Sequence, residues 1–598
     1  MLSVILIWIY IITTAFLLGY GILTGLTCLC PYRIKRWDAY LMCGLAAVTV
    51  YAQFFSIFAP VGLMANLILT LVCLAIAILL RKKLRADWQC ISERLRYEKS
   101  AAGKQPAAGA VFGIFLFLLY AYGTSRGILH YDTGLYHAQS IRWIEEFGVV
   151  KGLGNLHCRL AYNSSSFALS ALYSMAFLGG QSYHCAAGFM ALLVAGVCME
   201  LVSFVKRRHL KTSDFARIMA IYYLFIIFDE MVSPASDYFM VLTAFYLVIR
   251  WLDLLEEKEE TVFPYAMLCV LGVFLLTLKL SAALIILLAI KPAFVLIREK
   301  RFKEMAIYLG LGILTAAPYL IRNVLISGWL VYPFTGIDLF HVDWKIPEGI
   351  AAYDAKEIQV WGRGYTDVLL YDMPVKDWFP AWFQSIGGLD KWFLILAMAA
   401  VPVFAGRLVF GLLHIRNKCY EKGGLPERHL LTEAVMIVCF LIWLFSSPLI
   451  RYGCVYVYLT AAVVWGDVLT EFLDAHMECA GTGGSERIRK TQEKHYAGYA
   501  AAICKLLIGL FLIYKTAAFG RELIFSYNHT DYWVHQKDYE KYETEYYKIS
   551  DVMFFCPVEG DQTGYDSFPS SPVRAQIGLR GDTIRDGFYF RESGRPDV

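Results

Sequence analysis

The chain is poor in charge. Asp, Glu, Lys and Arg make up only 18% of its 598 residues, against roughly 25% in typical soluble domains, and the formal net charge is only +4. The basic residues stand in short clusters between apolar segments rather than along one face, so we exclude nucleic acid as a partner. What remains is mostly apolar: 58% of the residues are hydrophobic and the mean hydropathy is +0.50, which indicates a protein of the lipid bilayer.

The sequence also lacks the marks of a repeat protein and of a disulfide-rich domain. It shows no simple tandem repeat, and most of its fifteen cysteines fall in apolar segments, where cysteine behaves as a small hydrophobic residue. Cys158 and Cys556 stand in segments that we expect to be wet, and either pair with each other or remain two free thiols. Cys28 and Cys30 have no histidine or further cysteine near them, so we predict no metal there.

Apolar segments long enough to cross about 30 Å of hydrocarbon recur along the chain. We count fourteen and predict an all-α polytopic membrane protein with about fourteen transmembrane helices. The first segment is too long, and its flank TCLC too poor a cleavage site, for a signal peptide. The predicted spans are residues 2–29, 39–58, 61–80, 107–127, 182–204, 214–230, 238–254, 262–278, 281–297, 305–321, 391–413, 430–447, 454–473 and 497–519.

Clusters of Lys and Arg set the orientation. If successive helices cross the membrane in alternating directions, all of these clusters fall on the same side of it. Loops rich in Lys and Arg stay in the cytoplasm, so this side is cytoplasmic. Both termini then lie outside the cytoplasmic (inner) membrane. The clusters are RIKR (33–36), RKKLR (81–85), KRRHLK (206–211) and REKRFK (298–303).

This topology divides the chain into three parts. Residues 1–106 form a three-helix membrane segment with a cytoplasmic linker, and residues 107–519 a transmembrane core with large outer loops at 128–181 and 322–390. Residues 520–598 are less apolar and rich in turn-forming residues, so we expect a small extracytoplasmic C-terminal cap.

One stretch of the first outer loop, HYDTGLYHAQSIRWIEEFG (130–148), is strongly polar for this chain. From Leu135 to Phe147 apolar residues recur every three positions, which predicts an amphipathic helix at the membrane interface that ends at Gly148. Asp132 stands at the head of this helix. It is either an N-cap or a functional carboxylate that meets both lipid headgroups and water.

Two further polar residues of this loop have open roles. His137 either orients Asp132, binds an acceptor, or is a surface histidine without a partner. Residues 152–174 predict a second interfacial or re-entrant helix, in which Arg159 either lines a cavity or belongs to an ordinary polar loop.

Polar residues also gather at the outer ends of later spans. Basic side chains there often extend to the headgroups, which is one explanation for each of them alone. Together they suggest a site for a phosphate-bearing lipid, since Arg offers bidentate phosphate contacts and Lys a point charge. These residues are Asp237, Lys279, Arg322, Asn323 and Arg451.

Several motifs carry a resemblance. HYDTGLYHAQSIRWIEEFGVVKGLGNLHCRLAYNSSSF, SPASD, LKLSA, PYLIRNVLISGWLVYP, PVEGDQ and LRGDTIRDGFYF together resemble a family of uncharacterised bacterial polytopic membrane proteins, over nearly the whole chain. That family is similar to GT-C glycosyltransferases, which take sugar from polyprenyl-phosphate or polyprenyl-diphosphate donors outside the cytoplasmic membrane. The resemblance implies Asp132 as catalytic residue and Asp237 as the second acid. The chain departs from GT-C enzymes by its three early spans and by lacking an adjacent acidic pair, which leaves a divalent cation as an open alternative.

Sugar transfer suits these residues. It needs a base for the proton of the acceptor hydroxyl and cations for the departing phosphate. We assign the first role to Asp132, and the second to Arg322, Arg451 and Lys279. The acceptor is a glycan, lipid or protein. Four tryptophans of the long outer loop either stack on sugar faces or form an interfacial belt: Trp344, Trp361, Trp378 and Trp382.

Three other functions stay open on sequence alone. A flippase or glycan transporter would carry internal repeats and charges at mid-membrane depth. A glycan polymerase or ligase would differ mainly in donor size, and a scaffold would need no site.

Reporter fusions test the topology. Fusions after Lys83, Arg208 and Arg301 should report cytoplasm, because each lies in a basic cluster. Fusions within 335–385 and at the C-terminus should report the outside. An inward C-terminus would contradict the predicted topology.

Overall fold

The computed structural model describes residues 1–90, 105–205, 207, 209–416, 429–478, 487–527 and 532–591. Most of the predicted cytoplasmic linker, at 91–104, lies outside these residues, as does Arg208 of the third basic cluster.

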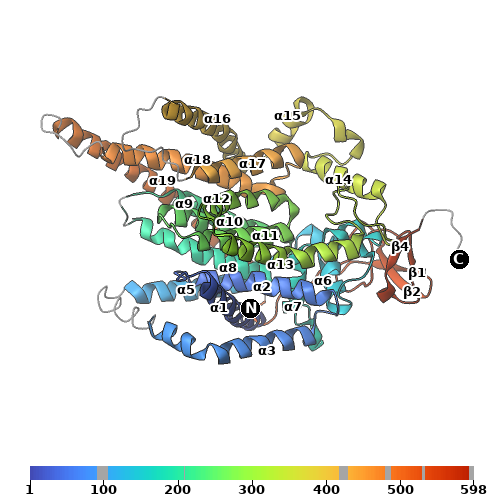
Figure 1. Cartoon of the computed structure of the whole chain (residues 1–598). Coiled ribbons are helices and arrows are strands. Elements are labelled where there is room, and N and C mark those ends of the chain that lie inside the picture. Colours follow the sequence, from blue (N-terminus) through green and yellow to red (C-terminus); the bar gives the residue numbers. More distant parts are fainter. Residues whose placement is uncertain are drawn as a thin grey trace.

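The described chain is mostly helical (Figure 1). Among the described residues, nine helices are long and apolar enough to cross a membrane, or ten if a pair bent by 70° is one span, as expected of a multi-pass membrane protein. The helices are α1 (Leu2–Leu29), α2 (Asp38–Ser56), α3 (Leu63–Leu79), α5 (Gln105–Ser125), α6 (Ala138–Glu146), α7 (Ser165–Tyr173), α8 (Ala186–Cys198), α9 (Thr212–Ile226), α10 (Ser236–Glu256), α11 (Val262–Leu278), α12 (Ile290–Arg298), α13 (Phe302–Ser327), α14 (Glu348–Gly362), α15 (Val375–Ser385), α16 (Gly388–Arg416), α17 (Leu430–Ser446), α18 (Ile450–Glu478) and α19 (Arg487–Tyr527).

Each predicted span falls on helical structure, which confirms the helical membrane class. Nine of the fourteen fall on the long apolar helices. The other five fall on α3, which is bent at its end, on α9, α11 and α17, which are shorter, and on α5, whose apolar part is the short stretch Gly109–Ser125. The number fourteen therefore stays a prediction.

The C-terminal region, for which the sequence predicts a cap but no particular fold, is a small β-containing unit. β1 (Thr544–Ile549) pairs antiparallel with β2 (Val552–Pro557), and β3 (Ile577–Leu579) pairs antiparallel with β4 (Phe588–Phe590). These strands lie at one end of the helical bundle, the end that also carries α6 and α14 (Figure 1). We call residues 532–591 the cap, and this end of the bundle the cap end.

Backbone hydrogen bonds attach the cap to both the N-terminus and the first large loop. The Met1 ammonium donates to the carbonyl of Tyr532 at 2.8 Å, and the Phe588 N–H donates to the carbonyl of Lys151 at 2.9 Å. The beginning of α1 and the cap therefore lie at the same end of the bundle.

The predicted amphipathic helix forms, but not as a helix exposed on a membrane surface. A π-helix, η1 (Thr133–His137), runs into α6, and Gly148 follows in the left-handed conformation at φ 75°. The polar side chains of α6 face the cap: Gln139 Nε2 donates to the Gly564 carbonyl at 2.8 Å, and Arg142 Nη1 to the Tyr565 carbonyl at 2.7 Å. The cap covers the polar face that we predicted to meet water.

The N-terminal helices pack closely on each other and on the core. A Cβ atom at Gly19 would lie 1.9 Å from the carbonyl oxygen of Tyr40, and one at Gly44 would lie 1.7 Å from that of Ala15. Only glycine permits this approach of α1 and α2, as is common between membrane helices. α2 also packs against α7 and α13, so the first helices and the core share one interior.

A network of ion pairs lies at the opposite end of the bundle. Arg250 Nη1 donates to Glu200 Oε1 and to Asp253 Oδ2, both at 2.8 Å, and Arg250 Nε donates to Asp38 Oδ2 at 2.9 Å. Arg36 Nη1 reaches the same Glu200 oxygen at 2.7 Å. Cations and carboxylates there neutralise one another within the protein.

The two cysteines considered as a disulfide are both free thiols. The Sγ of Cys158 lies 3.8 Å from Asp354 Oδ1, and the Sγ of Cys556 lies 3.6 Å from Glu545 Oε1.

Candidate functional site

The carboxylate of Asp132 does not cap a helix. Asp132 is the N-cap residue of η1, but its side chain accepts no capping hydrogen bond. Its Oδ2 instead accepts a hydrogen bond of 3.0 Å from Nη2 of Arg451, which is distant in sequence and belongs to α18. The N-cap explanation is therefore wrong for this side chain. A π-helix follows Asp132 directly. Such π-helical turns are frequent at functional sites, which is consistent with a functional role for Asp132.

Four charged side chains form an alternating chain at the cap end. Lys279 pairs with Asp237 Oδ1, whose Oδ2 lies 3.5 Å from Arg451 Nε. Arg451 then pairs with Asp132. The structure thus brings together both predicted acids and two of the three predicted phosphate-binding cations. We call Lys279, Asp237, Arg451 and Asp132 the charge cluster.

Each member of the charge cluster stands at the end of a helix. Asp237 is the second residue of α10, and Arg451 the second of α18. Lys279 is the extended C-cap residue of α11, where the chain turns into the 3-10 helix η6 (Leu280–Ala289). A carboxylate near a helix N-terminus is favoured by the helix dipole, whereas Arg451 opposes that of α18 and needs its two carboxylate partners.

His130 and Tyr452 complete the cluster, and neither was predicted from the sequence as a site residue. His130 Nδ1 lies 3.7 Å from Asp132 Oδ2, and Nε2 faces Arg451 Nη1. Burial, and then the Arg451 charge, lowers the pKa of His130 below its ordinary value, so the imidazole is neutral at pH 7. The ring of Tyr452 lies under the Lys279 ammonium, 4.3 Å from its centroid. The only sequence signal was adjacency: His130 precedes Asp132 by two residues, and Tyr452 follows Arg451.

His137 lies beside the cluster but is not an exposed ligand. The side chain is buried, its ring packs edge-on against Tyr136 at 4.4 Å, and Nδ1 lies 3.4 Å from Thr133 Oγ1. Burial lowers the pKa of His137 to about 3. A neutral, enclosed imidazole supports the packing of η1 rather than binding an anion.

Arg159 forms a neighbouring wall with α14. Arg159 Nη2 lies 3.7 Å from Glu357 Oε2, and the guanidinium stacks over the ring of Trp361 at 4.6 Å. Next to it, Asp354 accepts hydrogen bonds of 2.9 Å from Tyr162 and Tyr332. Arg159 therefore joins the two large loops. It makes no described hydrogen bond or ion pair with the charge cluster, but it lies near enough for the Asp132 charge to act on it.

Arg322 and Asn323 lie apart from the charge cluster. Arg322 Nε donates to Asn163 Oδ1 at 2.8 Å, and Nη1 donates to Ser56 Oγ. Asn323 Oδ1 accepts from Asn163 Nδ2 at 2.7 Å. The partners of Arg322 among the described residues are neutral, so Arg322 does not belong to the charge cluster. Ser164, next to Asn163, donates to the carbonyl of Leu278 and links the two groups.

The four tryptophans do not share one role. Trp378 and Trp382 are buried, and Trp344 Nε1 donates to the Val324 carbonyl at 3.0 Å. Trp361 alone stands beside Arg159 near the cluster.

The cap fixes the backbone on both sides of Asp132. Gln562 Nε2 donates to the carbonyl of Tyr131 at 2.7 Å. The N–H groups of Thr563 and Gly564 both donate to the carbonyl of Gly134, at 3.0 and 2.9 Å. The cap therefore holds the head of η1 in place and forms part of the surroundings of the site.

The divalent cation that the sequence leaves open has no preassembled set of protein ligands among the described residues. Within the described residues no group of three or more His, Cys, Asp or Glu side chains is placed to hold one. Asp132 and Asp237 are instead arranged around a guanidinium.

Comparison with known proteins gives one match. The model of a domain of unknown function (DUF8201) matches residues 1–458. No curated protein and no solved structure matches the chain. The matched residues contain all eight predicted site residues, through Arg451, and the cap follows them.

Burial of neutral His137 predicts acid sensitivity. The folded pKa of about 3 lies below the unfolded value of about 6.5, so the unfolded chain binds the extra proton between these values. Stability is complete above pH 6.5 and falls as the pH drops. We expect this residue alone to remove about 2 kcal/mol of unfolding free energy by pH 5.

Denaturant unfolding of the detergent-solubilised protein, followed by tryptophan fluorescence, measures this loss. His137→Gln should flatten the pH dependence, whereas His341→Gln, at an exposed position, should not. Equal pH dependence in wild type and His137→Gln would contradict a neutral His137.

Proposed function

This chain belongs to the DUF8201 family, defined by a domain of unknown function, and from its own geometry we propose that it is a membrane glycosyltransferase. It transfers a sugar from a polyprenyl-phosphate or polyprenyl-diphosphate donor to a glycan, lipid or protein acceptor of the cell envelope. One observation carries the proposal: Asp132, Arg451, Asp237 and Lys279 alternate in charge at helix ends that meet at the cap end.

The charge cluster offers what the transfer requires. Asp132 is partly exposed, with 14% of its side chain accessible, and can meet an acceptor hydroxyl that arrives from water. The Arg451 side chain is 32% exposed, so its guanidinium can be reached by an additional anion. Lys279 adds a second cation beside it.

The reaction balances with these groups alone. The acceptor oxygen forms a bond to the anomeric carbon while Asp132 takes the hydroxyl proton. The bond from the anomeric carbon to the phosphate oxygen breaks, and its electron pair stays on the phosphate. Arg451 and Lys279 stabilise that charge. Asp237 holds the two cations in position.

The proposal includes the predicted placement in the membrane. The cap end faces the outside of the cytoplasmic membrane, both termini are extracytoplasmic, and the chain crosses fourteen times in a GT-C-like arrangement. Lipid donor and aqueous acceptor meet where helix ends reach the polar boundary, which is where the charge cluster stands.

The distribution of ion pairs favours transfer over transport. A transporter binds its substrate near the bilayer midplane. The ion pairs described above gather at helix ends, in the charge cluster and in the network around Arg250 at the opposite end.

Asp132→Asn tests the base. Asn lacks a useful proton acceptor but keeps the shape and hydrogen-bonding size of the side chain. Transfer should fall on the order of 10²-fold or more while membrane abundance stays near normal. The assay incubates membranes with a panel of undecaprenyl-phosphate sugars and measures labelled product.

Asp582→Asn, an exposed position of the cap, is the matched control and should transfer normally. An Asp132→Asn protein with near wild-type transfer would remove Asp132 as the base and leave Asp237 as the next candidate.

Arg451→Gln tests phosphate recognition. Loss of a charge-assisted contact typically costs about 1.5 to 3 kcal/mol, so transfer at limiting donor should fall about tenfold or more. Arg451→Lys, which keeps the charge, should recover part of it. Arg574→Gln in the cap removes an exposed ion pair and should change nothing. Full activity of Arg451→Gln at limiting donor would reduce Arg451 to a structural residue.

A further inference from the structure

The imidazole of His130 has a hydrogen-bond donor aimed at each of its two nitrogens. The backbone N–H of Asp132 donates to Nδ1 at 3.1 Å, and Nη1 of the Arg451 guanidinium faces Nε2. The ring is neutral at pH 7 because burial lowers the pKa of His130, and a neutral imidazole has one N–H and one acceptor nitrogen. His130 therefore satisfies only one of these two donors.

The backbone donor decides which ring nitrogen carries the hydrogen. The N–H of Asp132 has no other described acceptor, and it belongs to a stretch of backbone that the cap holds on both sides. Arg451 is on a long side chain and already pairs with the carboxylates of Asp132 and Asp237. Since the hydrogen bond made by one ring nitrogen sets the protonation of the other, Nδ1 is the acceptor and Nε2 carries the hydrogen.

The contact at Nδ1 has the form of an Asx turn. In such a turn a side-chain acceptor takes the backbone N–H of the residue two positions later, as Nδ1 of His130 takes that of Asp132. An asparagine would make the same turn. The local backbone therefore needs only Nδ1, and Nε2 is left for another role.

The N–H at Nε2 faces the N–H of a guanidinium. Two donors that face each other repel unless one acceptor takes both hydrogens, and hydrogen bonds to a negatively charged oxygen are the strongest of this kind. Both side chains can be reached, since 12% of the His130 side chain and 32% of the Arg451 side chain are exposed. The two donors together suit an oxyanion.

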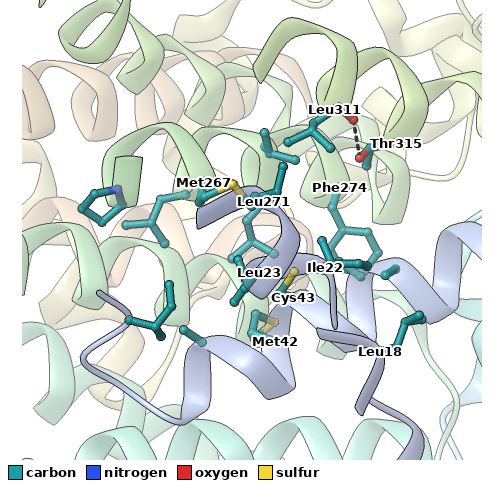
Figure 2. A pocket seen from close by; sticks show the side chains of 18 of the residues that line it. Leu18, Ile22, Leu23, Met42, Cys43, Met267, Leu271, Phe274, Leu311 and Thr315 are labelled. Carbon is teal, nitrogen blue, oxygen red and sulfur yellow. Dashed lines mark hydrogen bonds between the residues drawn. The ribbon is translucent and has the colours of Figure 1, made fainter. Parts of the chain in front are cut away.

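The large apolar cavity between α1, α2, α11 and α13 offers no such pair of donors among the described residues. Figure 2 shows the apolar side chains that line it, such as Leu271, and the Thr315 hydroxyl there donates to the Leu311 carbonyl at 2.8 Å. The cations that line the cavity each pair with a carboxylate, as Arg250 does with Asp38. An oxyanion is therefore favoured at His130 and not in this cavity.

We propose that His130 binds the phosphate of the donor through Nε2, and that one phosphate oxygen accepts hydrogen bonds from His130 Nε2 and Arg451 Nη1 together. This rests on the proposed function, since it adds a residue to the phosphate site of that reaction. The imidazole keeps its hydrogen and acts as a hydrogen-bond donor, because the phosphate leaves as an anion. A neutral donor adds recognition of phosphate without adding a charge to the balanced charge cluster.

His130→Asn tests the role of Nε2. The Asn side-chain oxygen keeps the turn with the Asp132 N–H but places no donor at the position of Nε2. Native mass spectrometry of the purified protein should show binding of undecaprenyl phosphate weakened about tenfold, since a hydrogen bond to a charged group is lost. Binding of undecaprenol, which lacks the phosphate, should not change.

Two further variants frame this result. His130→Gln has a longer side chain that brings an amide donor toward Arg451, so it should recover part of the preference for undecaprenyl phosphate over undecaprenol. His341→Asn, at an exposed position, is the matched control and should bind both lipids as the wild type does.

The outcomes separate this inference from the proposed function. A full preference for undecaprenyl phosphate in His130→Asn would overturn the inference alone and leave Arg451 as the phosphate ligand. A wild-type protein without that preference would overturn the lipid-phosphate donor, and the inference with it. Displacement of the lipid by an equal concentration of inorganic phosphate would overturn the assignment to lipid-linked phosphate.

The position of the hydrogen on His130 is measurable without any ligand. In protein labelled with 15N at its 12 histidines, the ring signals lost in His130→Asn or His130→Gln, whichever is recovered folded, identify His130. Nitrogen chemical shifts at pH 7 should show a protonated Nε2 and a bare Nδ1. A hydrogen on Nδ1 would overturn the inference, whatever the lipid-binding result.

Discussion

The guanidinium of Arg451 lies between two carboxylates, and the geometry of the site depends on this arrangement. It joins α18 to the loop before η1 through Asp132, and to α10 through Asp237, which in turn holds Lys279 at the end of α11. Asp237 is buried, so its carboxylate is costly unless it is paired, and removing a cationic partner leaves it exposed to that cost. Four segments distant in sequence are therefore fixed relative to one another by mutual neutralisation, and the cap adds hydrogen bonds on both sides of Asp132.

The sequence predicts which residues lie at helix ends. It does not predict how each helix is rotated about its own axis. Alternation of spans predicts that Asp132, Asp237, Lys279 and Arg451 share one end, because each borders an apolar segment. Which residues face one another depends on packing, which hydropathy does not encode. Arg322 illustrates this: it stands at the same end but faces Ser56 and Asn163.

Two other features were missed for different physical reasons. His130 carries no pattern of its own, and its significance depends on Arg451, far away in the chain. The strands of the cap are only three to six residues long and pair with one another in two separate two-stranded sheets, so no extended periodic signal marks them. The amphipathic pattern of α6 was correctly recognised. Its polar face meets the cap rather than water, because a polar surface of protein satisfies the same hydrogen bonds.

In the proposed reaction, proton uptake and phosphate stabilisation become one event. The charge cluster holds two carboxylates and two cations, so it is balanced before the reaction. When Asp132 accepts the acceptor proton it becomes neutral, and Arg451 loses one of its two countercharges at the moment when negative charge grows on the departing phosphate. Lys279 stays with Asp237, so the freed electrostatic attraction is that of Arg451. The base is already paired with the phosphate-binding cation. The proton transfer that activates the acceptor therefore also releases the cation for the leaving group, and no separate rearrangement is needed.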